Sequence, residues 1–237
     1  MTLALAALLG VAAGGLTTLA GQGGGLFLLL AVSAFLGPHA ALAITSPALL
    51  FGNAHRALLF RKLIDRPIAI RVILGAVPGA FAGGLVAGIL PPVGLHILLI
   101  GVTALAIAKH LGWIRFEVPR AALGPSGFVI GGLTGTAGGA GILQAPLLLA
   151  TGLTGSAFIG TSSIIACLTH FGRVVAYGSF GLFRRDLVLP TIVVTLAIFV
   201  GNALAERVRK HLSDRTTVRL EYGTLVVCVA LAVFGLG

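Results

Sequence analysis

Apolar segments follow one another along almost the whole chain and leave little polar sequence between them. Charged residues make up 9% of the 237 residues, and hydrophobic residues make up 57%. A soluble domain would carry roughly a quarter charged residues, so this chain cannot cover a water-facing surface. We therefore predict an all-α, multi-pass (polytopic) protein of the cell membrane, inner or plasma, with the lipid bilayer as its solvent. The apolar segments lie at about 3–20, 24–36, 40–60, 68–90, 93–109, 121–137, 141–152, 155–178, 187–205 and 218–236.

Two of these segments, 24–36 and 141–152, are too short to cross a bilayer, because a crossing helix needs about 20 residues. Each follows a glycine-rich break, which reads Gly21-Gln22-Gly23-Gly24-Gly25 in the first case and Gly138-Gly139-Ala140-Gly141 in the second. Short, glycine-interrupted segments at matching places in two halves of a chain indicate the binding site of a transporter. We expect broken or re-entrant helices at both places.

The two halves of the sequence repeat each other at a nearly constant spacing. Gly14-Gly15-Leu16-Thr17 recurs as Gly131-Gly132-Leu133-Thr134, and Ile44-Thr45-Ser46-Pro47 is echoed by Gly160-Thr161-Ser162-Ser163, at spacings of 116 to 117 residues. An ordered series of this kind indicates an internal duplication. It predicts a first membrane repeat over residues 1–112 and a second over residues 113–237 of one transmembrane domain.

Positive charges gather in three loops. Of the 16 Lys and Arg residues, 12 fall in segments 61–71, 109–120 and 207–219. The positive-inside rule places these loops in the cytoplasm, which leaves only Arg184 and Arg185 on the wrong side. Each half then makes an odd number of crossings, so the halves have opposite orientations. This is the inverted-topology plan of many secondary transporters.

A helix that restarts after a glycine break inside the membrane offers an anion unpaired backbone donors. Its first N–H groups have no partner within the helix, and its dipole is positive there. We expect the short helices to begin at about Gly25 and Gly141, with their N-termini facing one anion site near mid-membrane. Close helix packing is the other interpretation of such glycines. We adopt this interpretation for most of the 35 glycines in the chain. The backbone positions expected at the site are Gly23, Gly24, Gly25, Gly139, Ala140 and Gly141.

Polar side chains inside the apolar segments are candidates to donate hydrogen bonds to an anion. A hydroxyl costs less to bury than a charge, although a lone Ser or Thr often bonds its own helix backbone. Hydroxyls recur in both repeats, and two glutamines and an asparagine add amides. These candidates are Thr45, Ser46, Thr161, Ser162, Gln22, Gln144 and Asn53.

Arg56 and Arg173 lie outside the loops and occupy equivalent places in the repeat. A buried arginine in a membrane segment needs a partner and is a binding-site hypothesis by default. The alternative is that each side chain snorkels to the membrane surface. His55 and His170 lie nearby, and a histidine can carry a coupled proton near neutral pH.

The residues and motifs that the sequence lacks restrict the class of substrate. All six acidic residues fall at or near segment ends, whereas cation pathways and carboxylate proton relays normally need one inside a crossing. The sequence therefore favours a small anion. It has no G-x-x-x-x-G-K-[ST] motif and does not interleave basic with aromatic residues, so we expect no ATP, no nucleic acid, no metal and no cofactor.

The paired motifs resemble one known family. The first half contains Gly21-Gln22-Gly23-Gly24-Gly25 and Ala43-Ile44-Thr45-Ser46. The second half repeats them as Gly138-Gly139-Ala140-Gly141-Ile142-Leu143-Gln144-Ala145-Pro146 and Gly160-Thr161-Ser162. This duplicated pair of motifs is similar to that of the TauE/SafE sulfite exporter family. The resemblance covers nearly the whole chain. It implies transport of sulfite, sulfoacetate or related sulfur-containing anions.

The sequence thus favours a non-enzymatic transporter that works by alternating access, and it leaves a homodimer open. Alternatives stay open too. An anion channel also accommodates re-entrant helices. A membrane scaffold or a subunit of a larger complex would have no polar cavity. An intramembrane serine protease is suggested by Gly124-Pro125-Ser126-Gly127, with Ser126 as nucleophile and His170 as base.

Overall fold

The computed structural model describes residues 1–21, 23–110, 119–138 and 143–209, together with residues 211, 223 and 227. Every regular element within these ranges is a helix, which confirms the all-α prediction. The α-helices are α1 (Leu3–Leu19), α2 (Gly24–Leu36), α3 (Pro38–Leu59), α4 (Arg66–Ile89), α5 (Pro92–His110), α6 (Leu123–Ala137), α7 (Gln144–Leu149), α8 (Gly155–Ser179) and α9 (Arg185–Arg209), and the short 3₁₀ helices are η1 (Arg61–Leu63) and η2 (Arg120–Ala122).

Local sequence explains where several helices begin. Thr2 caps α1 through its hydroxyl, which accepts a hydrogen bond from Leu5 N at 3.3 Å. Asp65 caps α4 in the same way, with its carboxylate accepting from Ile68 N at 3.0 Å. Such caps satisfy backbone donors that the first turn leaves unpaired. Pro38 opens α3 directly after Gly37, where proline's missing N–H costs nothing.

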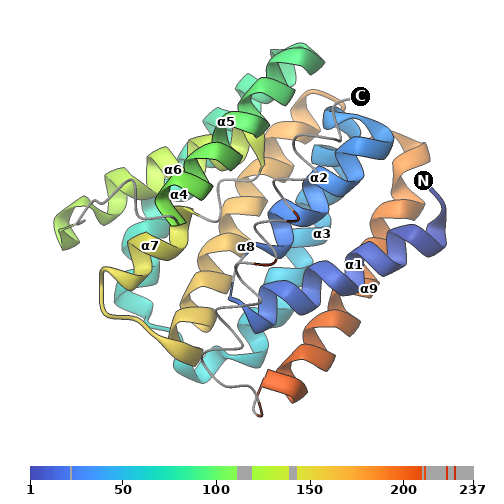
Figure 1. The fold of residues 1–237 in the computed structure, drawn as a ribbon. Helices are drawn as coiled ribbons and strands as arrows, with labels where there is room; N and C mark the ends of the chain where they lie inside the picture. The colour runs from blue at the N-terminus through green and yellow to red at the C-terminus, as the bar shows by residue number, and fades with distance from the viewer. Residues whose placement is uncertain are drawn as a thin grey trace.

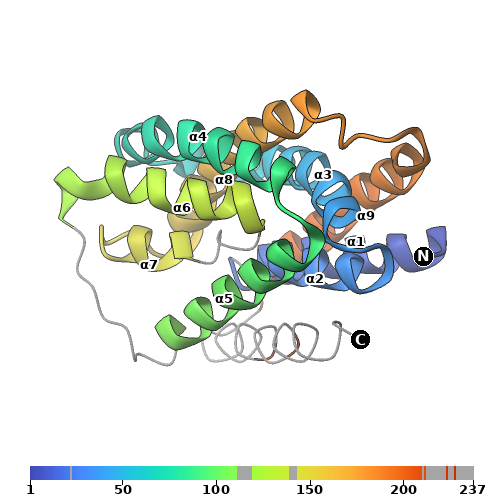
Figure 2. The same cartoon turned by 90° about the horizontal axis from the view of Figure 1, so that it is seen from above.

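Helices from the two halves of the chain interlock. The most extensive helix pairs are α4 with α6 and α1 with α9, and α3 and α8 pack against each other between these pairs. Figure 1 shows α1 beside α9, and Figure 2 shows α4, α6 and α8 on one side of the molecule and α1 and α2 on the other. The predicted repeat spacing of 117 residues would match α6 to α1 and α9 to α4. Each of the two pairs therefore joins one helix from each half.

Glycines bring α4 and α6 into backbone contact. Gly75, Gly79 and Gly83 follow one another at four-residue intervals on α4, and a Cβ at any of them would overlap a backbone carbonyl oxygen of α6. Small residues at this spacing allow two membrane helices to approach closely. Close packing, the interpretation adopted for most of the glycines, therefore holds for this stripe.

Three of the described helices are long and apolar enough to cross a membrane, namely α4, α8 and α9. Together with the shorter apolar helices α1 and α2, they agree with a polytopic membrane protein. The exposed Arg184 forms a two-point ion pair with Asp186, with Nε and Nη2 donating at 3.0 and 2.8 Å. This pairing offsets the charge of one of the two arginines that depart from the positive-inside pattern.

The short helices follow glycine breaks, but they differ in length from one another. The first, α2, spans the predicted segment 24–36. The second, α7, has six residues from Gln144, with Leu143 as its N-cap, and the predicted start at Gly141 lies outside the described residues. The prediction of a helix over 141–152 was too long at its C-terminal end, since residues 150–152 form a turn that ends at Gly152 with a φ of +87°.

Candidate functional site

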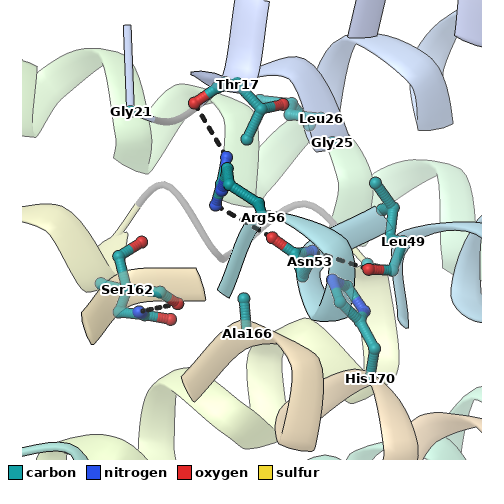
Figure 3. Close-up of a pocket in the computed structure, with 13 residues that line it drawn as sticks. Thr17, Gly21, Gly25, Leu26, Leu49, Asn53, Arg56, Ser162, Ala166 and His170 are labelled. Atoms are coloured by element: carbon teal, nitrogen blue, oxygen red, sulfur yellow. Dashed lines mark hydrogen bonds between the residues drawn. The ribbon is translucent and has the colours of Figure 1, made fainter. Parts of the chain in front are cut away.

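A cavity of about 70 Å³ lies between the end of α1, the start of α2, the C-terminal half of α3 and the middle of α8. Figure 3 shows Gly21, Gly25 and Leu26 on one side, Ser162, Ala166 and His170 of α8 on the other, and Arg56 with Asn53 of α3 between them. Gly138 at the end of α6 and Gln144 at the start of α7 complete the wall. Both glycine breaks thus reach one cavity.

The first glycine break turns the N-terminus of α2 toward this cavity. Gly21 and Gly23 have φ angles of +79° and +89°, a region that L side chains rarely adopt. Gly23 is the N-cap of α2 and supplies no side-chain cap. A Cβ on Gly24 would overlap the Ala13 carbonyl and the Thr17 hydroxyl. Because Gly23, Gly25 and Leu26 line the cavity, the unpaired N–H groups of this first turn lie at its wall.

Arg56 lines the cavity and is only 2% exposed. Its Nη1 donates to the Thr17 carbonyl oxygen at 2.8 Å, its Nη2 to Asn53 Oδ1 at 2.9 Å, and its Nε to Ser163 Oγ at 2.5 Å. All three partners are neutral. The guanidinium is therefore fixed in place, while its positive charge has no counter-charge among these contacts.

Arg173 is fully buried on α8 and has a similar set of neutral neighbours. Its Nη1 bonds His170 Nδ1 at 2.8 Å, and its Nε donates to the Tyr177 hydroxyl at 3.3 Å, beside whose ring the guanidinium also lies. Tyr177 in turn donates to the Gly135 carbonyl at 2.5 Å. Arg173 Nη2 has no hydrogen-bond partner among the described residues and lies next to Gly138. This open donor faces the second glycine break.

The predicted hydroxyl and amide candidates divide into two groups. Ser162 and Gln144 line the cavity, and the Gln144 amide donates to the Ser162 carbonyl at 3.1 Å. Thr161 is buried outside it, where its hydroxyl accepts from Asp65 N at 2.9 Å. Thr45 and Ser46 are also buried outside the lining, with no partner for their hydroxyls among the described residues. Four further residues predicted at the site lie outside the described residues, namely Gln22, Gly139, Ala140 and Gly141.

The two histidines do not share one environment. His170 lines the cavity, whereas His55 packs its ring against Phe199 of α9, with 5.0 Å between the ring centroids. Ser126, the nucleophile of the protease alternative, lies near the start of α6 and lines neither of the two cavities that His170 lines. The described hydrogen bonds pair His170 with Arg173 and not with Ser126.

Sequence reasoning left six of the described lining residues out of the predicted site, namely Thr17, Gly21, Leu26, Leu49, Gly138 and Ala166. Thr17 contributes its backbone carbonyl to Arg56, which no side-chain pattern signals. Asn53 and Gly138 carry a signal in the repeat, because Asn53 lies 117 residues before His170 and Gly21 lies 117 residues before Gly138. In the structure, Asn53 and His170 each accept a hydrogen bond from the arginine three residues further along their helix. A spacing of 117 residues thus matches His170 to Asn53 rather than to His55.

The described site combines positive charge, unpaired backbone donors and neutral hydrogen-bonding side chains. None of the described residues that line the cavity is acidic. The described residues contain no group of three or more His, Cys, Asp or Glu side chains that could hold a metal ion. Such a set of donors suits a small anion, which can accept from several N–H groups and offset the buried arginine charge.

The fold and this cavity together define a polytopic helical membrane protein with a buried basic site. The chain matches the family model described as "Sulfite exporter TauE/SafE" over residues 6–233, and it therefore belongs to that family. Membership indicates a membrane transporter of sulfur-containing anions. No curated protein and no solved structure matches the chain.

Proposed function

We propose that this protein is a secondary transporter of small anions, with sulfite or an organosulfur anion such as an organosulfonate as substrate. The anion occupies the cavity beside Arg56 and the N-terminus of α2. Family membership supports the substrate class. The geometry supports the place, because the cavity joins a buried cation to unpaired N–H groups and lies between helices of both halves.

One observation carries this proposal, namely that Arg56 is buried with three neutral partners. Burying a charge without a counter-charge is costly in a protein interior, and it persists where function requires it. A bound oxyanion supplies the missing negative charge. Gln144, Ser162 and His170 are placed to position it, since they line the same cavity.

The proposed mechanism is alternating access between two inverted repeats, residues 1–112 and 113–237. The reciprocal packing of α1 with α9 and of α6 with α4 supports this plan, because related helices make related contacts. In inverted-repeat transporters one repeat rocks against the other around a fixed central site. The protein would reside in the cell membrane with its three basic loops in the cytoplasm and would need neither ATP nor a cofactor.

Binding and flux measurements on the purified, reconstituted protein test this function. Sulfite, sulfate, thiosulfate and methanesulfonate are presented separately, with sodium and potassium as cation controls. The proposal expects saturable transport of at least one sulfur anion and no transport of the cations. Transport of a cation without any anion would refute it, and anion flux that does not saturate would favour a channel instead.

A further inference from the structure

We infer that His170 binds the anion as a neutral hydrogen-bond donor, through Nε2–H, and is not the carrier of a coupled proton. This inference rests on the proposed function and assigns a role within the same site. Its starting point is the contact between Arg173 Nη1 and His170 Nδ1 at 2.8 Å.

Arginine fixes the tautomer of this histidine. A guanidinium has donors and no acceptor, and it stays protonated in proteins. Nδ1 must therefore accept, and the proton of the neutral ring lies on Nε2. A second proton on Nδ1 would point at the N–H of Arg173 and would break this contact. Among the described residues that line the cavity, the charged one is Arg56, also a cation, and none is acidic. The surroundings therefore favour the neutral ring.

The other ring nitrogen is the free one. His170 is 6% exposed and lines the cavity, and no hydrogen bond joins its Nε2 to a described residue. Its counterpart in the first repeat, Asn53, accepts from Arg56 in the same way but donates its amide N–H to the Leu49 carbonyl of its own helix at 2.8 Å. Asn53 thus commits one of its two amide N–H groups to its own helix, whereas the single N–H of the neutral His170 ring is not used by any described residue.

The comparison with Asn53 also bears on protonation. An asparagine holds the equivalent arginine without titrating, so the shared task is to accept one N–H and fix the guanidinium. His170 performs this task with Nδ1 and adds a cavity donor with Nε2. The substrate class that suits this donor is an oxyanion, whose oxygen accepts from Nε2–H while Arg56 supplies the charge.

Two substitutions separate the ring nitrogens. In His170→Gln the amide nitrogen reaches about as far as Nε2, whereas in His170→Asn the amide oxygen takes the place of Nδ1 and the distant donor is lost. We expect His170→Gln to bind sulfite within about 3-fold of the wild type. We expect His170→Asn to bind about 10- to 100-fold more weakly, because it lacks a hydrogen bond to a charged group. Sulfite titrations of the purified proteins measure both constants.

The outcomes are distinguishable. Equal loss in both variants, or loss in His170→Gln alone, overturns the role of Nε2 while leaving the transporter intact. Failure of the wild type to bind any of the four sulfur anions overturns the proposed function itself. If the variants do not fold, ¹⁵N NMR of the histidine-labelled wild-type protein in nanodiscs tests the inference without any substitution. It should show a neutral ring protonated on Nε2 at neutral pH, and a doubly protonated ring would refute the inference.

A separate observation points to a switch between the repeats. Arg56 of α3 donates to Ser163 of α8. At a spacing of 117 residues, Arg173 of α8 matches Arg56, and Ser46 of α3 matches Ser163. Both are buried, and Arg173 Nη2 and Ser46 Oγ have no partner among the described residues. Given the proposed repeats, we infer that the two Arg–Ser bonds form alternately. In the opposite state Arg173 would bond Ser46, and Arg56 would release Ser163.

Two matched variants test the alternation by hydrogen–deuterium exchange. Ser163→Ala removes the bond that is formed here, so exchange at residues 20–26, which follow Thr17 along the chain, should increase, because Arg56 also holds the Thr17 carbonyl. Ser46→Ala removes the bond of the other state, so exchange at the same residues should fall below that of the wild type. Changes in the same direction, or an inert Ser46→Ala variant that is folded by its melting curve, would overturn the alternation.

Discussion

Replacing Arg56 by glutamine tests the electrostatic basis of the site. Arg56 is 2% exposed, so its charge acts on a bound anion with little screening by bulk water. Two unit charges about 4 Å apart interact with about 4 kcal/mol at an effective dielectric constant of about 20. Each 1.4 kcal/mol corresponds to about tenfold in affinity, so Arg56→Gln should weaken sulfite binding by about a thousandfold.

Isothermal titration of the purified protein with sulfite measures this loss directly. The matched control is Arg61→Gln, because Arg61 is exposed on η1 and lines no part of the cavity. The control should bind sulfite as the wild type does. Comparable melting temperatures establish that both variants are folded. If folded Arg56→Gln bound sulfite within about threefold of the wild type, the cavity would not be the anion site.

Two further predictions concern glycines. Gly79→Ala should destabilise the protein by about 1–3 kcal/mol, because its Cβ would overlap the Phe128 carbonyl of α6. Gly101→Ala is the control and should leave the stability unchanged, because no atom lies within 4 Å of its Cβ. Thermal unfolding in detergent compares the two variants, and equal stabilities would refute the packing argument. Gly23→Ala and Gly37→Ala both place a side chain at a positive φ, of +89° and +79°, and each should cost about 1–2 kcal/mol of stability. Only Gly23→Ala should also weaken sulfite binding, because Gly23 lines the cavity. Equal sulfite affinity of the two variants would contradict the role given to the start of α2.

Most of the fold could be predicted from the sequence, because apolar runs bounded by glycine, proline and charge fix helices in a membrane protein. The segment 155–178 was found as Gly155–Ser179, and the segment 24–36 was found unchanged. The helix α7 was predicted too long because an apolar run does not show where backbone hydrogen bonding stops. Which helices pair was not predicted, since this depends on the contact surfaces that glycines such as Gly79 create.

The site was predicted in part. The sequence signalled Arg56, Gln144, Ser162 and His170, since a polar residue within an apolar segment is conspicuous, and all four line the cavity. It gave no means to separate them from Thr161, whose hydroxyl instead holds the backbone of Asp65. Thr161 and Ser162 are adjacent on α8 and point in different directions, and only the packing around that helix decides which one meets the cavity.

Flux of radiolabelled sulfite into proteoliposomes tests the central claim most directly. The account predicts saturable uptake by the wild type, uptake by Arg61→Gln at the same rate, and uptake by Arg56→Gln no faster than by protein-free liposomes. Wild-type uptake no faster than that of protein-free liposomes, or equal uptake by all three proteins, would contradict it.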